Sequence, residues 1–204
     1  LLDVDIDKPI LEAFEAALEV FRGLGATIEE VACPFADEVN PLRRAIADAE
    51  FFRVHGERHA GNPDGYGDRL QERIVNAEKT TLPMYIDALN RRKILKREMA
   101  AILEGFDAML SPGYPCVAAP VETTMANVNG KEMDFIGLGR NLVGLQNFLG
   151  FPGLNMPTGF DPELGLPMSL QITTLPGDEA GGMRIGHAYE QATPDLRDRK
   201  PDLG

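Results

Sequence analysis

The side chains that could act as nucleophiles are few in this sequence. It contains two serines, Ser111 and Ser169, among 204 residues. Many serine hydrolases expose the nucleophilic hydroxyl on a strained turn flanked by glycines. Ser111 instead precedes Pro112 at the end of a predicted strand, and Ser169 lies within another predicted strand. We therefore expect neither serine to be a nucleophile.

Histidine and cysteine do not complete a catalytic or metal-binding set either. His55 and His59 are four residues apart on a predicted helix and could face one metal ion. No third ligand is visible, so two surface or loop-edge histidines are favoured. His187 has no obvious serine or cysteine partner, which favours a role in helix packing. Cys33 and Cys116 lack metal or disulfide spacing, so we expect buried thiols, no metal and no cofactor.

The charge balance argues against two classes of partner. An excess of 32 Asp and Glu over 20 Lys and Arg gives a net charge of −12. Nucleic acids and anionic membranes both favour a basic protein surface, so we expect neither as the main partner. No apolar run approaches the roughly 20 residues that span a bilayer. The acidic charge and the thiols favour a cytoplasmic protein.

The first half of the chain predicts helices separated by short strands. Asp7 and Pro9 are typical of a helix start, and apolar residues follow at helical spacing until glycines end the helix. Thr81 is suited to cap a later helix. The predicted elements after the first helix are a strand over residues 26–34, helices over 41–59 and 81–104, and a buried strand over 106–112.

The second half predicts a helix and then a hairpin braced by proline. Residues 113–133 lack clear periodicity, and Asp134 is expected to cap a helix that Gly150 ends. The turn "DPELG" separates two extended runs, and the prolines in them must lie at strand ends or on an edge strand. Asp178 then begins a last helix. From the residues alone, the chain is an α/β domain with no complete active site.

The hairpin sequence "NFLGFPGLNMPTGFDPELGLPMSLQIT" resembles the C-terminal hallmark of the amidase signature family. Upstream, "FDAMLSPGYPCVAAP" is similar to the strand element of that family, and downstream "GDEAGGMRIGHAYEQAT" is similar to its last helix. The first helix and strand, ending "LGATIEEVACP", also resemble a unit of the family. The hallmark residues that fall in register are Asn147, Gly150, Pro152, Pro157, Gly165, Leu166, Pro167, Leu170 and Gln171.

The resemblance implies part of a layered α/β/α sandwich with a central mixed sheet. It also implies an amide hydrolase in which a serine attacks the carbonyl and a lysine acts through a second, bridging serine. The Gly/Ser-rich segment that carries these residues has no match here, so residues 1–204 are expected to be the C-terminal portion of an amidase-like domain. The chain begins with Leu1 rather than Met, which we interpret as a piece of a longer protein.

Several alternatives stay open. The chain could be a non-catalytic binding or regulatory subunit that has only this half of the fold. It could also be an amidotransferase subunit, which would use glutamine. The expected partners are a small-molecule amide and the missing N-terminal half of the same fold, and a homo-oligomer is left open.

The resemblance also suggests which residues bind the substrate. Gln146, Asn147 and Phe148 open the hallmark run and are candidates. In glutamine-using members an Asp lies shortly before this run, and Arg140 takes its place here. A positive charge favours a carboxylate or carbonyl over an ammonium group, so Arg140 is a fourth candidate and glutamine is a disfavoured substrate.

Overall fold

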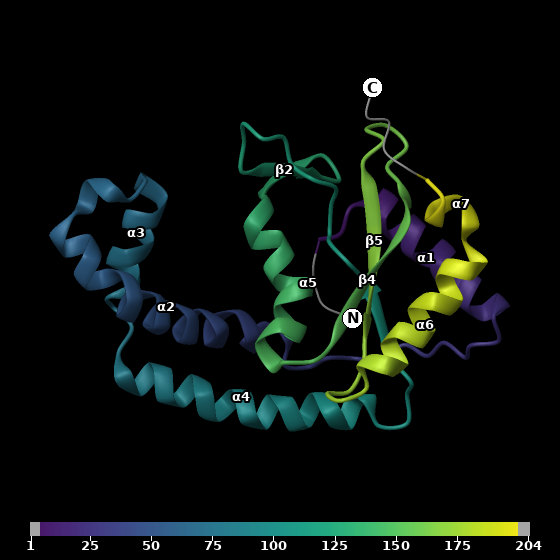
Figure 1. The fold of residues 1–204 in the computed structure, drawn as a ribbon, viewed down its shortest axis with the longest axis horizontal. Coiled ribbons are helices and arrows are strands. Elements are labelled where there is room, and N and C mark those ends of the chain that lie inside the picture. Colours follow the sequence, from purple (N-terminus) through teal and green to yellow (C-terminus); the bar gives the residue numbers. More distant parts are fainter. Residues whose placement is uncertain (1–4, 200–204) are drawn as a thin grey trace.

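The computed structural model describes residues 5–199, apart from the side chains of Arg140 and Asn141. Its centre is a three-stranded antiparallel sheet in the order β1-β5-β4. The strands are β1 (Met109–Pro112), β4 (Gly153–Phe160) and β5 (Pro167–Thr173). Helices lie on both sides of this sheet (Figure 1). The α/β class and the layered arrangement predicted from the sequence are confirmed, and the strands of this chain pair only antiparallel among the described residues.

The predicted hairpin is formed by β4 and β5. Gly153 lies opposite Thr173, and the pairing continues to the turn with one irregularity between Pro157 and Gly159. Asp161 holds the turn, because its carboxylate accepts hydrogen bonds from the backbone N–H groups of the next residues. Pro157 lacks an N–H, and β4 is an edge strand, where proline is tolerated.

One face of the sheet packs against α1 (Lys8–Gly23) and α6 (Glu179–Ala192). Leu170 and Ile172 of β5 are fully buried there against Phe21 and Tyr189, whose rings stack 5.0 Å apart. Asp178 caps α6 as predicted, because its carboxylate accepts the N–H of Gly181. A short helix, α7 (Pro194–Arg197), follows α6.

The opposite side of the sheet is covered by α5 (Phe135–Leu149), supported by α2 (Ala36–Gly61) and α4 (Leu82–Leu103) (Figure 1). The predicted caps of these helices are confirmed: Thr81 accepts the N–H of Met84, Asp134 accepts that of Gly137, and Gly150 ends α5 with φ of 73°. Residues of α2, α4 and α5, with Phe35 just before α2 and Phe151 just after α5, form one core cluster: Phe35, Val39, Leu95, Met99, Leu103, Leu145, Phe148, Leu149 and Phe151.

The second helix is longer than the sequence predicted. It starts at Ala36, five residues before the expected position, and keeps Pro41 inside it. With the 3-10 turn η1 (Pro63–Gly65) and α3 (Asp68–Ala77), its second half forms an arm that extends away from the sheet (Figure 1). His55 and His59 lie in this arm with their rings against Tyr66. They therefore pack on an aromatic side chain.

A second hairpin was missed from the sequence. β2 (Met125–Val128) and β3 (Lys131–Asp134) pair around Asn129 and Gly130. Asn129 joins the hairpin tip to the start of α1: its Oδ1 accepts the Lys8 N–H at 3.0 Å and its Nδ2 donates to the Ile6 carbonyl at 2.9 Å. The Asn-Gly pair favours a tight hairpin turn and was the signal in the sequence.

The strand predicted over residues 26–34 is wrong. This segment has no assigned strand pairing, although two of its side chains lie in different clusters. Ile28 and Leu110 pack against the cluster of α1 and α6, whereas Cys33 and Met109 pack against the cluster of α4 and α5. Opposite placement of side chains an odd number of residues apart is typical of extended backbone, but among residues 5–199 no neighbouring strand forms a ladder with this segment.

No helix among the described residues is both long and apolar enough to cross a membrane.

Candidate functional site

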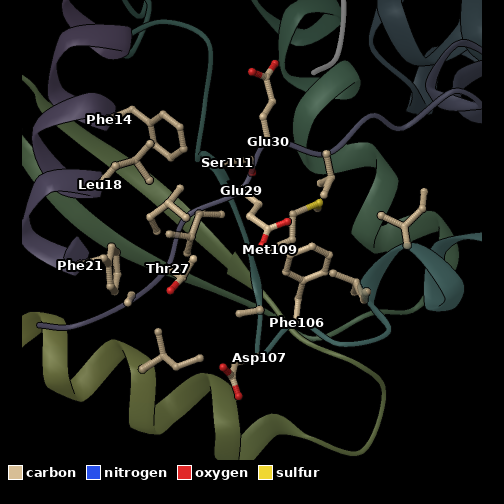
Figure 2. Close-up of a pocket in the computed structure, with 18 of the residues that line it drawn as sticks. Phe14, Leu18, Phe21, Thr27, Glu29, Glu30, Phe106, Asp107, Met109 and Ser111 are labelled. Carbon is tan, nitrogen blue, oxygen red and sulfur yellow. The ribbon is translucent and has the colours of Figure 1, made fainter.

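A large groove lies between α1, residues 26–33 and β1. Its volume is about 1090 Å³. Figure 2 shows Phe14, Leu18 and Phe21 lining it from α1, with Thr27 and Glu29 from the extended segment and Met109 from β1. The floor is therefore apolar, while carboxylates such as Glu29 and Asp107 supply polar groups around it.

One edge of β1 faces β5, and the other edge has no strand beside it among the described residues. The Gly113 N–H donates to the Ser169 carbonyl at 2.7 Å. In an antiparallel ladder, residues with hydrogen bonds toward the partner alternate with residues whose groups point away. Met109 and Ser111 therefore bond toward β5, and the N–H and carbonyl of Leu110 point away from it, toward the side of residues 26–33.

Gln146, one of the candidate substrate-binding residues, lines this groove. It lies on α5 and is 5% exposed, and its Oε1 has no hydrogen-bond partner among the described residues. A buried amide oxygen without a partner is costly, so this atom is suited to accept an N–H from a molecule or segment that enters the groove.

The other candidate residues do not converge on Gln146. Asn147 is exposed, and Phe148 is buried in the core, where the Arg92 guanidinium lies 5.6 Å from its ring and Arg92 Nε donates to its carbonyl. Neither residue lines the groove. Arg140 lies in α5, and its side chain is outside the described residues.

The two serines are placed as strand residues. Ser111 lines the groove from β1, and Ser169 packs against Gly113, where a Cβ would collide with its hydroxyl oxygen. His187 is exposed and lies 3.7 Å from Glu190, so the predicted packing role is wrong. Among the described residues, neither serine is hydrogen bonded to a histidine. The described part of the chain therefore shows no serine–histidine pair that could act as nucleophile and base.

The cysteines are poor nucleophiles at neutral pH. Burial raises the pKa of the Cys33 thiol above its ordinary value. Burial, with a contribution from the Asp7 carboxylate, raises the pKa of Cys116 to about 11. Since the thiolate is the reactive form, both side chains remain protonated near pH 7. Among residues 5–199, no group of three or more His, Cys, Asp or Glu side chains could hold a metal ion.

Comparison with known proteins identifies the family. The amidase family model matches residues 1–181. The chain belongs to the amidase family. It is 30% identical over 224 aligned positions to the A subunit of the glutamyl-tRNA(Gln) amidotransferase from Heliobacterium modesticaldum, and 31% identical over 215 positions to the corresponding protein from Chloroflexus aggregans. These alignments cover 98% and 94% of this chain but 44% and 42% of the relatives.

A solved amidase structure has the same fold. It superposes with a TM-score of 0.85 and 25% identity, covering 93% of this chain and 43% of the solved one. The chain thus spans less than half the length of the amidase relatives it matches. The resemblance in the hairpin and last helix is confirmed by this match.

Proposed function

We propose that the complete protein hydrolyses the C–N bond of a carboxamide, giving a carboxylate and ammonia or an amine. This chain would be the C-terminal part of that enzyme. The observation that carries the proposal is the amidase family match over residues 1–181 in a chain less than half as long as its relatives. The nucleophilic serine, the bridging serine and the lysine would then lie outside these 204 residues.

The placement of Ser111 and Ser169 supports the proposal that the catalytic residues lie outside this chain. A nucleophile needs a base within hydrogen-bond reach and donors for the oxyanion, and Ser169 is instead packed between strands against Gly113. The chain's contribution would be the sheet and the walls around the reacting atoms. Gln146 would accept a hydrogen bond from the amide N–H of the substrate, because its Oε1 has no partner among the described residues and the residue lines the groove.

Arg140 lies six residues before Gln146 on the same helix. We propose that its charge selects substrates with a carboxylate or carbonyl near the amide. The test is the specificity constant of Arg140→Ala in the complete enzyme, with Arg140→Lys as the variant that keeps the charge. An unchanged specificity constant for every amide tested would rule out this role.

The reading frame upstream of Leu1 gives a direct test of the proposed function. A lysine and a Gly/Ser-rich run in the same polypeptide support it, and a start codon immediately before Leu1 contradicts it. The matching assay measures ammonia release from a panel of carboxamides by the complete protein and by this chain alone. We expect turnover by the complete protein and none by the 204 residues.

A second candidate function comes from the curated relatives, which are amidotransferase subunits. Such a protein would release ammonia from glutamine and pass it to an acceptor. Glutamine is therefore included in the panel, with and without an acceptor. Release from glutamine that exceeds release from simple amides would favour the amidotransferase over the hydrolase.

A further inference from the structure

The sequence contains a single Asn-Gly pair, Asn129-Gly130. Asparagine is most prone to deamidation when glycine follows it, because glycine has no side chain to hinder the approach of its backbone nitrogen to the asparagine Cγ. Both residues are exposed to solvent at the tip of the hairpin of β2 and β3. The pair therefore has the sequence and the exposure of a modification site.

The reaction needs water as its co-reactant and nothing else. The Gly130 backbone nitrogen loses its proton to a solvent base and attacks the Asn129 Cγ, so that a new C–N bond closes a cyclic imide. The bond between Cγ and Nδ2 then breaks, and Nδ2 takes up a proton from water and leaves as ammonia. Water adds to either imide carbonyl and reopens the ring, which gives aspartate or isoaspartate at position 129.

In the folded chain, hydrogen bonds hold each group that takes part in this reaction. The Asn129 Oδ1 accepts the Lys8 N–H at 3.0 Å, and its Nδ2 donates to the Ile6 carbonyl at 2.9 Å. The attacking nitrogen is held as well, because the Gly130 N–H donates to the Asn127 Oδ1 at 2.8 Å. Turning the Asn129 Cγ toward Gly130 would break the first two bonds, and deprotonating Gly130 would break the third.

These contacts join the hairpin tip to the start of α1, which is distant in the sequence. The Asn129 N–H also donates to the Asp7 carboxylate at 2.9 Å. We propose that Asn129 is a deamidation site gated by α1, and that the imide forms only when the hairpin tip separates from residues 6–8. Amide hydrolysis by the complete protein plays no part in this inference, so the two proposals fail separately.

Conversion would weaken the attachment irreversibly. Aspartate has no N–H to donate to the Ile6 carbonyl, and its carboxylate would lie near that of Asp7, where like charges repel. Isoaspartate in addition places the side-chain methylene in the main chain and so disturbs the tight turn. Because α1 lines the groove beside β1, a loosened start of α1 would alter one wall of that groove.

The test follows conversion at position 129 by peptide mapping with mass spectrometry, which separates asparagine, aspartate and isoaspartate. The folded chain is incubated at mildly alkaline pH beside the same chain unfolded in guanidinium chloride. Lys8→Pro removes the N–H that holds the Asn129 Oδ1. Proline fits there, because Lys8 is the first residue of α1 and Asp7 before it is extended, with φ of −65° and ψ of 141°. Lys8→Ala is the matched control that keeps the N–H.

We expect the folded chain to convert about tenfold or more slowly than the unfolded chain, because the hydrogen bonds must break first. Lys8→Pro should raise the rate in the folded chain about three- to tenfold, whereas Lys8→Ala should leave it unchanged. In guanidinium chloride all of these chains should convert at one rate, since the gate is absent there.

A second variant carries the same test if Lys8→Pro does not fold. Asp7→Ala removes the carboxylate that accepts the Asn129 N–H, and it costs α1 no side-chain cap, because the Asp7 side chain makes no cap hydrogen bond. Asp7→Ala should therefore also speed conversion in the folded chain. Asp5→Ala is its control, since Asp5 is an exposed acidic residue of the same segment.

Three results would overturn the inference. The first is equal conversion in the folded and unfolded chains, which would show that the contacts do not restrain Asn129. The second is a rate for Lys8→Pro, or for Asp7→Ala in its place, no higher than that of its control. A rate below the control would show that the Lys8 N–H polarises the amide toward attack instead of holding it. The third is that Asn129 does not convert even in the unfolded chain, which would remove the site.

Discussion

The two edges of the central sheet differ in how their backbone groups are satisfied. On the β4 edge, Pro157 has no N–H to offer, and its carbonyl accepts a hydrogen bond from the Tyr189 hydroxyl at 3.2 Å. On the β1 edge, Leu110 keeps both its N–H and its carbonyl directed outward, beside a groove of about 1090 Å³. Proteins block the natural ends of a sheet with proline, bulges or covering helices.

Among the described residues, the β4 edge of the sheet is therefore closed, whereas the β1 edge has no strand beside it. The β4 edge also carries an irregularity between Pro157 and Gly159 and is covered by α6 and α7. The β1 edge has Pro112 at its last residue but, within residues 5–199, no such covering along Leu110.

The largest expected effect is on β5, the central strand that pairs with both edge strands. Leu170 of β5 is fully buried between the helices and the sheet. Leu170→Ala should lower the free energy of unfolding by about 2–5 kcal/mol through lost burial and a cavity. Urea unfolding measures this, with Leu164→Ala as the control, because Leu164 is 65% exposed in the hairpin turn. Equal losses in the two variants would contradict the placement of the core.

Asn129 fastens the second hairpin to the start of α1, the helix that lines the groove beside β1. Asn129→Ala should cost about 2–3 kcal/mol, because two hydrogen bonds are lost and alanine must adopt a φ of 51°. Asn129→Gly loses the same bonds without the backbone penalty and should cost about 1–2 kcal/mol. Thermal unfolding compares the two. A glycine variant less stable than the alanine variant would contradict the left-handed turn.

Opening the closed edge should have a moderate effect. Tyr189→Phe removes the hydroxyl that bonds to the Pro157 carbonyl, at a cost of about 0.5–1.5 kcal/mol. Tyr85→Phe is the matched control, since its hydroxyl makes an exposed 3.4 Å contact with Glu50 and should matter little. Chemical denaturation of both variants distinguishes them, and a null result for Tyr189→Phe would mean that this edge is not closed by α6.

The smallest effect is expected far from both edges, at the ion pair of Glu38 and Arg91. The Arg91 guanidinium donates two hydrogen bonds to the carboxylate, at 2.6 and 2.7 Å, and holds the pKa of Glu38 below its usual value of 4.5. Because the pKa is lower in the folded state, the ion pair stabilises the protein fully at pH values above the usual pKa of 4.5. This contribution is lost as the pH falls through the lowered folded-state pKa.

Glu38→Gln should therefore lower Tm by less than about 2 °C at pH 7, because both side chains of the pair are partly exposed to solvent. The difference from the unmodified chain should shrink as the pH falls below 4.5. Thermal melts across this range provide the measurement. A difference that grows at low pH would have the wrong sign for this ion pair.

The parts of the fold that local chemistry determines were predictable. The caps at Thr81, Asp134 and Asp178 and the turn at Asp161 depend on side chains within a few residues, so the sequence carries them. The family resemblance also came from such local runs. The long second helix was harder, because tertiary packing keeps Pro41 inside it against its intrinsic preference.

Features that depend on distant partners could not be read from the sequence. Residues 26–34 have the alternation of a strand, but a strand needs a neighbour, and pairing is a property of the whole sheet. The Gln146 Oε1, which lacks a partner among the described residues, and the outward N–H of Leu110 likewise emerge only when the elements are assembled. All four predicted substrate residues, Arg140, Gln146, Asn147 and Phe148, stay predictions, because their roles depend on groups that this chain does not supply.

The central claim is that the β1 edge is open in this chain and the β4 edge is closed. Amide hydrogen exchange of the 204-residue chain, followed residue by residue by NMR, tests it most directly. The account predicts fast exchange at Leu110 and slow exchange at Met109 and Ser111, whose N–H groups bond to β5. Equal protection at all three positions would show that the chain covers its own β1 edge and would contradict the account.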